Sequence, residues 1–202
     1  MTRRLSWRAT GWALSLIVAG VAPAMAGDGA ASSPAKGDAS PAPDYEPVRG
    51  QQGVWDADIR FFDVDGKPSG QARGVQRNEL LSNGHWVTND FRVFDAAGVD
   101  VPPSFQGHGV WGWDPVAREY IDAWVDTHDG AVRIDHGSWN ADTRTMYWTA
   151  LQPDGQGHSV NYRMTEQYEK DGLRTLTFFQ VALQSGRLVK LAEIRFTRRD
   201  KA

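Results

Sequence analysis

From Gly53 onward, apolar and polar residues alternate over short runs, the pattern of β-strands with one buried face. The runs are rich in Val, Ile, Thr, Phe, Tyr and Trp. Turn dipeptides separate them: Asp65-Gly66, Asn83-Gly84, Asp129-Gly130, Asp154-Gly155, Asp171-Gly172 and Ser185-Gly186. Because Asn-Gly and Asp-Gly accept the positive φ of tight hairpin turns, neighbouring runs are expected to pair as a meander.

The runs predict ten strands and no long helix, with one short helical turn considered at residues 115–118. The predicted strands lie near residues 53–63, 70–82, 85–95, 104–113, 119–127, 131–139, 144–152, 158–169, 173–184 and 187–199. In the last two strands, alternation predicts these buried faces: Leu173, Thr175, Thr177, Phe179, Val181 and Leu183, then Leu188, Ala192, Ile194 and Phe196.

The predicted fold class is all-β: a single antiparallel up-and-down β-barrel occupying residues 51–202. About 150 residues in one domain suffice for a full core. A meander of this size removes its exposed edges by closing on itself, and closed barrels of this size commonly enclose a cavity. A flat sandwich of two sheets is the structural alternative.

The N-terminal residues 1–26 have the pattern of a secretory signal peptide. Arg3, Arg4 and Arg8 precede an apolar run, and Ala24-Met25-Ala26 forms a cleavage site. The run is shorter than the roughly 20 apolar residues that span a bilayer. We therefore expect cleavage near Ala26 and a periplasmic or secreted protein, with Sec export favoured over the twin-arginine route.

Residues 27–50 are dominated by Ala, Pro, Ser and Gly. Such a segment buries too little apolar surface to offset the entropy of ordering it, so a disordered leader is predicted, with Tyr45 and Val48 as possible packing residues at its end.

Composition excludes several function classes. The chain has no cysteine, which excludes disulfides, thiolate metal sites and a cysteine nucleophile. Loss of three signal-peptide arginines leaves 19 of the 22 basic residues against 25 acidic ones, a net charge of −6. This charge argues against nucleic acid or an anionic membrane as partner, and no apolar segment long enough for a transmembrane anchor remains.

The segment Gly53–Arg198 resembles a bacterial family of calycin-like domains known only as a domain of unknown function and related in fold to lipocalins and fatty-acid-binding proteins. The resemblance rests on Gly53-Val54-Trp55, Asn83-Gly84-His85-Trp86-Val87, Phe105-Gln106-Gly107-His108-Gly109, Gly112-Trp113-Asp114-Pro115, Tyr120–Asp126 and Ile194–Arg198. It implies a closed barrel in which Trp55 is covered by an arginine of the last strand, Arg195 or Arg198.

Residues 120–128 contain the strongest candidate binding residues. Alternation places Tyr120, Asp122, Trp124 and Asp126 on one face of a strand. If this face points inward, buried acids beside aromatic walls give a cavity with shifted pKa values and a polar anchor for a ligand. If it points outward, the acids are solvated surface charges.

His136, beside Asp135, and His108 are further candidates for the interior. A histidine close to Asp122 would form an acid/base pair or a metal ligand. The sequence contains no H-x-H or H-E-x-x-H spacing, and no histidine beyond His158 for a haem pocket, so we predict no metal and no cofactor.

Aromatic residues and one basic residue complete the candidate set. Trp111, Trp113, Trp124, Trp139, Trp148, Tyr147 and Tyr162 form either a packed core or a cavity wall. Arg163 and Glu193 form either a buried pair that anchors a carboxylate or a surface pair. The predicted ligand-binding residues are Trp111, Trp113, Tyr120, Asp122, Trp124, His136, Tyr147 and Arg163.

Three functions follow from a barrel of this kind. The first is an exported module that binds a small hydrophobic or amphipathic molecule in its cavity. The second is a cofactor-free isomerase or hydrolase that uses His136 and Asp122 in the same cavity. The third is an interaction module of the cell envelope with a filled core. No Gly-x-Ser-x-Gly elbow or glycine-rich phosphate loop supports another chemistry.

Overall fold

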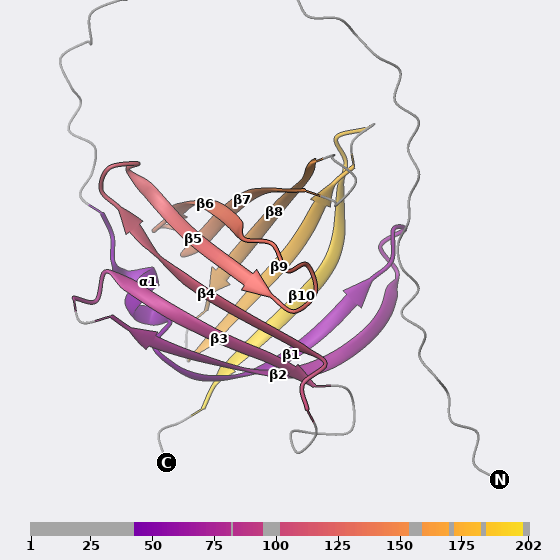
Figure 1. Cartoon of the computed structure of the whole chain (residues 1–202), viewed down its shortest axis with the longest axis horizontal. Helices are drawn as coiled ribbons and strands as arrows, with labels where there is room; N and C mark the ends of the chain where they lie inside the picture. The colour runs from indigo at the N-terminus through magenta and orange to yellow at the C-terminus, as the bar shows by residue number, and fades with distance from the viewer. Residues whose placement is uncertain are drawn as a thin grey trace, which may run out of the picture. The chain divides into compact units, whose positions relative to one another are not determined.

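Ten antiparallel strands close into one barrel in the computed structural model of the chain (Figure 1). The structure describes residues 43–81, 83–94, 102–153, 159–169, 172–182 and 185–199. The strands are β1 (Gly53–Phe62), β2 (Pro68–Leu80), β3 (Trp86–Phe94), β4 (Phe105–Asp114), β5 (Glu119–Asp126), β6 (Arg133–Asn140), β7 (Thr145–Pro153), β8 (Ser159–Tyr168), β9 (Leu173–Val181) and β10 (Leu188–Arg198). The predicted signal peptide lies outside the described residues.

Each strand pairs with its neighbours in chain order, and β10 pairs with β1 to close the sheet (Figure 1). The closing register runs from Trp55 opposite Arg198 to Phe61 opposite Ala192. The ten predicted strands and the up-and-down barrel are thus confirmed, and the sandwich alternative is excluded. Gly84 shows the predicted turn chemistry, because its φ of 67° is available to glycine at little cost.

Residues 115–118 form a turn and not a helix. The carboxylate of Asp114 accepts the backbone N–H of Val116 at 2.7 Å, and Arg118 ends the turn at a φ of 58°. A positive φ is incompatible with a continuing right-handed helix.

The buried face predicted for β9 is wrong. Arg174, Leu176 and Phe178 face the interior, and the odd-numbered residues face the other side. Both faces of this strand carry large apolar residues, so alternation did not distinguish them. In β10, Ala192, Ile194 and Phe196 face inward as predicted, but Leu188 is exposed because the register shifts between Lys190 and Ala192.

A short segment closes one end of the barrel. Helix α1 (Glu46–Gly50) buries Pro47 and Val48 against the barrel. The preceding Asp44 accepts hydrogen bonds from the Tyr120 hydroxyl and from Nε1 of Trp139, the latter at 2.9 Å. The packed domain therefore includes residues 43–50, although their composition predicted that they belong to the leader. Pro47 and Val48 explain the difference, because they are buried apolar residues of a kind that is scarce in the rest of the leader sequence.

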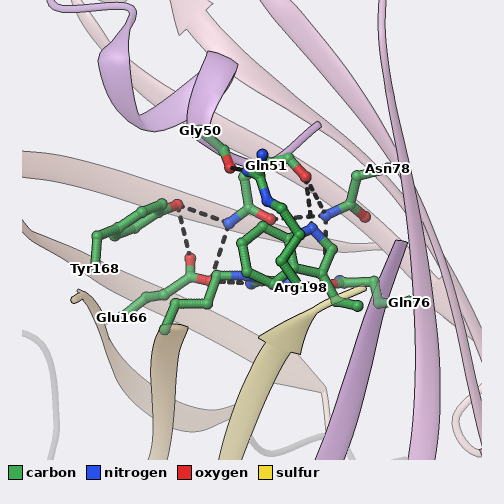
Figure 2. A network of polar contacts seen from close by, with 9 residues as sticks. Gly50, Gln51, Gln76, Asn78, Glu166, Tyr168 and Arg198 are labelled. Carbon is green, nitrogen blue, oxygen red and sulfur yellow. Dashed lines mark hydrogen bonds and ion pairs between the residues drawn. The ribbon is translucent and has the colours of Figure 1, made fainter. Parts of the chain in front are cut away.

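A buried polar network lies beneath α1 and forms the floor of the barrel (Figure 2). The amide nitrogen of Gln51 donates to Oε1 of Glu166 at 2.9 Å and to the Tyr168 hydroxyl at 2.6 Å. Asn78 donates to Oε1 of Gln51 at 2.8 Å, and Nε1 of Trp55 donates to the Gln51 carbonyl at 2.8 Å. The network joins the helix to β1, β2 and β8.

Arg174 lies at the centre of this floor and is almost fully buried. Its guanidinium donates to Glu166 and to Gln76. The same group stacks 3.8 Å from the ring centre of Phe196 and 4.7 Å from that of Trp55. An ion pair and two aromatic faces therefore offset the cost of burying this charge.

The outer side of Trp55 is covered by Arg198, whose guanidinium carbon lies 4.5 Å from the ring centre. Arg198 also donates to the Gly50 carbonyl (Figure 2). Of the two arginines that the family resemblance suggested, Arg198 therefore covers the tryptophan, and it ties the end of β10 to α1.

Replacing Gly112 by alanine is expected to destabilise the barrel by about 1–3 kcal/mol. A Cβ there would lie 2.3 Å from the His85 carbonyl oxygen and 2.7 Å from Trp86. Gly70→Ala is the control, since its Cβ would meet only Phe61 at 3.7 Å, and its effect should stay below about 1 kcal/mol. Urea unfolding measures both, and equal effects would contradict the packing argument.

Replacing Arg174 by methionine is expected to reduce the free energy of unfolding by about 3–5 kcal/mol, because Glu166 would remain buried without its cation. Adding Glu166→Gln should recover part of the loss. A double-mutant cycle in urea measures this coupling, and strictly additive losses would show that the two charges do not stabilise one another.

Candidate functional site

The barrel encloses a cavity of about 410 Å³ to which all ten strands contribute side chains. Gln51, Gln76, Glu166 and Arg174 of the floor network line its closed end. At the other end the lining includes His128, which is exposed in the turn after β5, so the cavity reaches the surface there. The volume lies in the range of small-molecule sites, roughly 300–1,000 Å³.

The predicted face of β5 points inward. Asp122, Trp124 and Asp126 line the cavity, and Tyr120 is buried deeper, beside Trp111. The Tyr120 hydroxyl donates a hydrogen bond to the backbone carbonyl of Asp44, and burial raises the pKa of this tyrosine to about 12. Tyr120 therefore belongs to the sealed end of the barrel and not to the cavity wall.

Two glycines of β4 make room for this face. A Cβ at Gly107 would lie 2.1 Å from the indole of Trp124, and one at Gly109 would lie 3.0 Å from Oδ1 of Asp122. Nε1 of Trp124 donates to Asp126 at 2.9 Å, which fixes the indole in place. The spacing of these glycines thus determines where Asp122 and Trp124 lie.

Asp122 and Asp135 lie directly opposite each other on β5 and β6. Arg133 binds Asp135 through two charge-assisted hydrogen bonds, of 2.7 and 2.8 Å. Within the described residues, Oδ1 of Asp122 is buried and has no hydrogen-bond partner.

The environment of Asp122 favours its protonated form. Burial raises the pKa of Asp122 to about 8, and repulsion from Asp135 adds to the rise while Arg133 opposes it. Two adjacent carboxyls in a site of low polarity do not both ionise readily. At neutral pH Asp122 is therefore mostly in its neutral, protonated form.

A second unsatisfied oxygen lies in the cavity wall. Asn89 of β3 lines the cavity, and its Oδ1 is buried without a partner among the described residues. Buried polar atoms are nearly always hydrogen-bonded, so such atoms in a cavity wall mark positions for a ligand or for water.

Three predicted binding residues lie outside the barrel and are corrections to the sequence analysis. The ring of His136 bonds Glu119 at 2.9 Å, Tyr147 is 43% exposed, and Arg163 is also exposed. In each case the next residue or the one before it faces inward, namely Asp135, Trp148 and Met164. Because strand side chains alternate, these three must face solvent.

Alternation also explains why other residues considered from the sequence lie outside the cavity. His108 lies on the outer face between Gly107 and Gly109, so it is absent from the cavity lining. Glu193 bonds Lys190 and not Arg163. The proposed acid/base pair of His136 and Asp122 does not form, because one residue is outside the barrel and the other inside.

The aromatic residues serve both predicted roles. Trp111, Trp124, Trp148 and Tyr162 line the cavity, whereas Trp113 packs 5.1 Å from Tyr120. Trp139 packs on Tyr168 near the floor. The cavity wall is therefore a subset of the aromatic residues, while Trp113 and Trp139 pack in the core and Tyr147 lies on the outer face.

Sequence reasoning missed several lining residues: Asn89, Arg133, Gln152, Glu166 and Arg174. Glu166 could have been predicted from the sequence, since this glutamate shares its strand face with Met164 and Tyr168. Arg174 could not have been predicted, because alternation assigned the odd-numbered residues of β9 to the interior.

In the described part of the chain, no group of three or more His, Cys, Asp or Glu is placed to hold a metal ion. Helix α1 has five residues, and no described helix is of a length and apolar character to span a bilayer.

Residues 40–198 match the family described as "Protein of unknown function (DUF1579)". The chain belongs to this family. The match covers the whole barrel and the segment that closes its floor. The family resemblance stated from the sequence is therefore confirmed at the level of a domain of unknown function with a barrel fold.

The barrel is similar to a crystal structure of Rv2717c from M. tuberculosis, with a TM-score of 0.59 and 12% identity over 79% of this chain and 99% of that one. This likeness shows the fold alone. A DUF3598 family protein of unknown function from Nostoc punctiforme aligns with a TM-score of 0.22 and 11% identity over 77% of this chain and 98% of that one. Among curated proteins, none matches the chain.

Replacing Asp122 by asparagine is expected to stabilise the protein at high pH. The pKa of Asp122 is about 8 in the folded chain. An unfolded aspartate has a pKa of about 4, so between these pH values the folded state binds the extra proton and stability falls as pH rises. The variant lacks this loss. Its free energy of unfolding should exceed that of the parent by at least about 1 kcal/mol at about pH 8, and the difference should shrink toward about pH 4.

Urea unfolding of the parent and the variant at both pH values measures this difference. A variant that is less stable than the parent at the higher pH would show that Asp122 is ionised and stabilising in the folded state.

Proposed function

We propose that this protein is an exported binding protein that holds a small hydrophobic or amphipathic molecule inside its barrel. The observation that carries the proposal is the cavity of about 410 Å³, which combines an aromatic wall with buried polar atoms that lack partners. Sites for small molecules are mostly apolar and contain a few polar groups that fix orientation.

The wall favours a ligand with an apolar body. Trp111, Trp148 and Phe91 are nearly fully buried and line the cavity, together with Phe178 and Leu176. A ligand against these side chains would gain about 25 cal/mol for each Å² of apolar surface removed from water. A planar ring or an aliphatic chain suits such a wall.

The polar atoms favour a ligand that also carries a polar end. Oδ1 of Asp122 and Oδ1 of Asn89 are buried without partners in the described structure. An unsatisfied buried group costs about 1–3 kcal/mol, and a ligand donor would recover part of that cost. The ligand is therefore amphipathic in this proposal.

The two rival functions receive less support. The enzyme hypothesis required His136 beside Asp122, and His136 lies on the outer face, where it bonds Glu119. Asp122 retains a raised pKa, so one of the two groups that hypothesis needs is present. The filled-core hypothesis expects a solid interior, and the described barrel is hollow.

The place of action in this proposal follows from residues 1–26, whose signal-peptide pattern motivates export to the periplasm or beyond. The ligand would then be a molecule that is encountered in the cell envelope or outside the cell.

Binding of Nile red, a neutral apolar dye, tests the proposal. Ala192 lines the cavity, so Ala192→Trp should fill part of it and weaken dye binding at least tenfold. Ala123, on the opposite face of β5, is absent from the lining, and Ala123→Trp is the matched control that should bind like the parent. Dye fluorescence measures both affinities.

Native mass spectrometry of the protein purified from its host, followed by identification of released molecules, gives a second readout. A reproducible bound compound that Ala192→Trp excludes and Ala123→Trp retains is the expected result. Equal dye binding by both variants, with no bound compound, would overturn the proposed function.

A further inference from the structure

We infer that the ligand of this cavity is an organic cation, a protonated amine with an apolar body, whose ammonium group lies against the carboxyl of Asp122. This inference rests on the proposed binding function and names the chemical class of its ligand. It is drawn from the balance of charges in the cavity and from the unpartnered oxygen of Asp122.

Acidic groups outnumber basic groups in the cavity wall. The described lining contains five carboxyl groups, from Asp122, Asp126, Asp129, Asp135 and Glu166. It contains two guanidinium groups, and each is already paired, Arg133 with Asp135 and Arg174 with Glu166. Each described arginine of the wall therefore has a carboxylate partner, and Nε of Arg174 is the one guanidinium nitrogen among them found buried without a hydrogen-bond partner.

The hydrogen bonds found for the remaining carboxylates come from neutral donors. Asp126 accepts from Nε1 of Trp124 and from the backbone N–H groups of His128 and Asp129. Asp129 accepts from the amide of Gln152. Neutral donors orient a carboxylate without cancelling its charge, so the end of the cavity that reaches the surface is negative and attracts cations.

A ligand carboxylate is disfavoured for the same reason. A fatty acid in such a barrel needs a cation to offset its charge once it is out of water. A fatty acid bound here would bring a further negative charge to arginines that Asp135 and Glu166 already neutralise. A cationic ligand is favoured instead, since the unpartnered buried oxygen of Asp122 can accept a hydrogen bond from the N–H group of the ligand.

The cavity already holds a cation of this kind from its own chain. The Arg133 guanidinium lies 5.9 Å from the ring centre of Trp124 and 5.6 Å from that of Phe178, with Asp135 as its counterion. Aromatic faces and a carboxylate together bind cations. Asp122, directly across from Asp135 and beside Trp124, can offer a second cation the same combination.

Binding of a cation should be coupled to the proton on Asp122. The charged groups that act on Asp122 are Asp135 and Arg133 of β6 and Glu166 of β8, while β4 presents Gly109 and Trp111. With the pKa of Asp122 at about 8 in the free protein, an incoming ammonium group must displace its proton. The affinity should therefore rise by up to about 50-fold between about pH 6 and about pH 8.

Three probes of equal chain length test the inference: decylamine, decanol and decanoate. Decylamine stays protonated over this pH range. It should bind at least about tenfold more tightly than decanol at about pH 8, and decanoate should bind most weakly. Displacement of Nile red gives the affinities, and calorimetry in buffers of different ionisation enthalpy gives the proton released on binding.

Asp122→Asn tests the residue itself. It keeps the shape of the neutral acid but cannot become an anion, so decylamine binding should fall at least tenfold and lose its pH dependence, whereas decanol binding is unchanged. Asp58→Asn is the matched control, because the Asp58 carboxylate is 73% exposed on β1 and is absent from the cavity lining. It should bind all three probes like the parent.

The failures are distinguishable. Tighter binding of decanoate than of decylamine would overturn the cation inference and leave the proposed function standing. Full decylamine affinity in Asp122→Asn would overturn the assignment to Asp122. Absence of binding of all three probes and of Nile red to the parent would overturn the proposed function as well.

Discussion

The pairing of β10 with β1 is the constraint on which the rest of the structure depends. Once the sheet is closed, every strand has one face inside and one outside, and a side chain cannot change sides without shifting the register of its strand. This constraint places Asp122 beside Asp135 in the cavity and His136 on the surface. It also brings Arg174 of β9 under α1, where one guanidinium links Glu166 to Gln76 and seals one end.

Buried charges are paired at one end of the barrel and incompletely paired toward the other. At the floor, Arg174 and Glu166 neutralise each other between Trp55 and Phe196, and this end is closed. Toward the other end, Asp122 has no counterion of its own because Arg133 is committed to Asp135. A buried carboxyl in this position reduces stability, and such costs are commonly found where a protein binds a ligand. The cation inference is built on this difference.

Membership of a family of unknown function and likeness to a structure at 12% identity establish the fold, but one fold serves many functions. The cavity itself is therefore the feature that indicates a function. Its aromatic wall suits many apolar molecules, whereas the unpartnered oxygens of Asp122 and Asn89 restrict the polar end of the ligand. The electrostatic features of the site are more specific than its shape.

The sequence by itself determined the strands, their order and which residues of β5 share a face, because alternation and turn residues such as Asn83-Gly84 are local signals. It left open whether that face points inward. It did not determine the inward face of β9, where apolar residues such as Phe178 and Phe179 occupy both faces, nor the side on which His136 lies. Those outcomes depend on which residues of neighbouring strands stand opposite one another, and only closure of the sheet decides that. The pairing of Arg133 with Asp135, which leaves Asp122 alone, was decided in the same way, since a charge acquires its counterion only when the folded chain brings the two together.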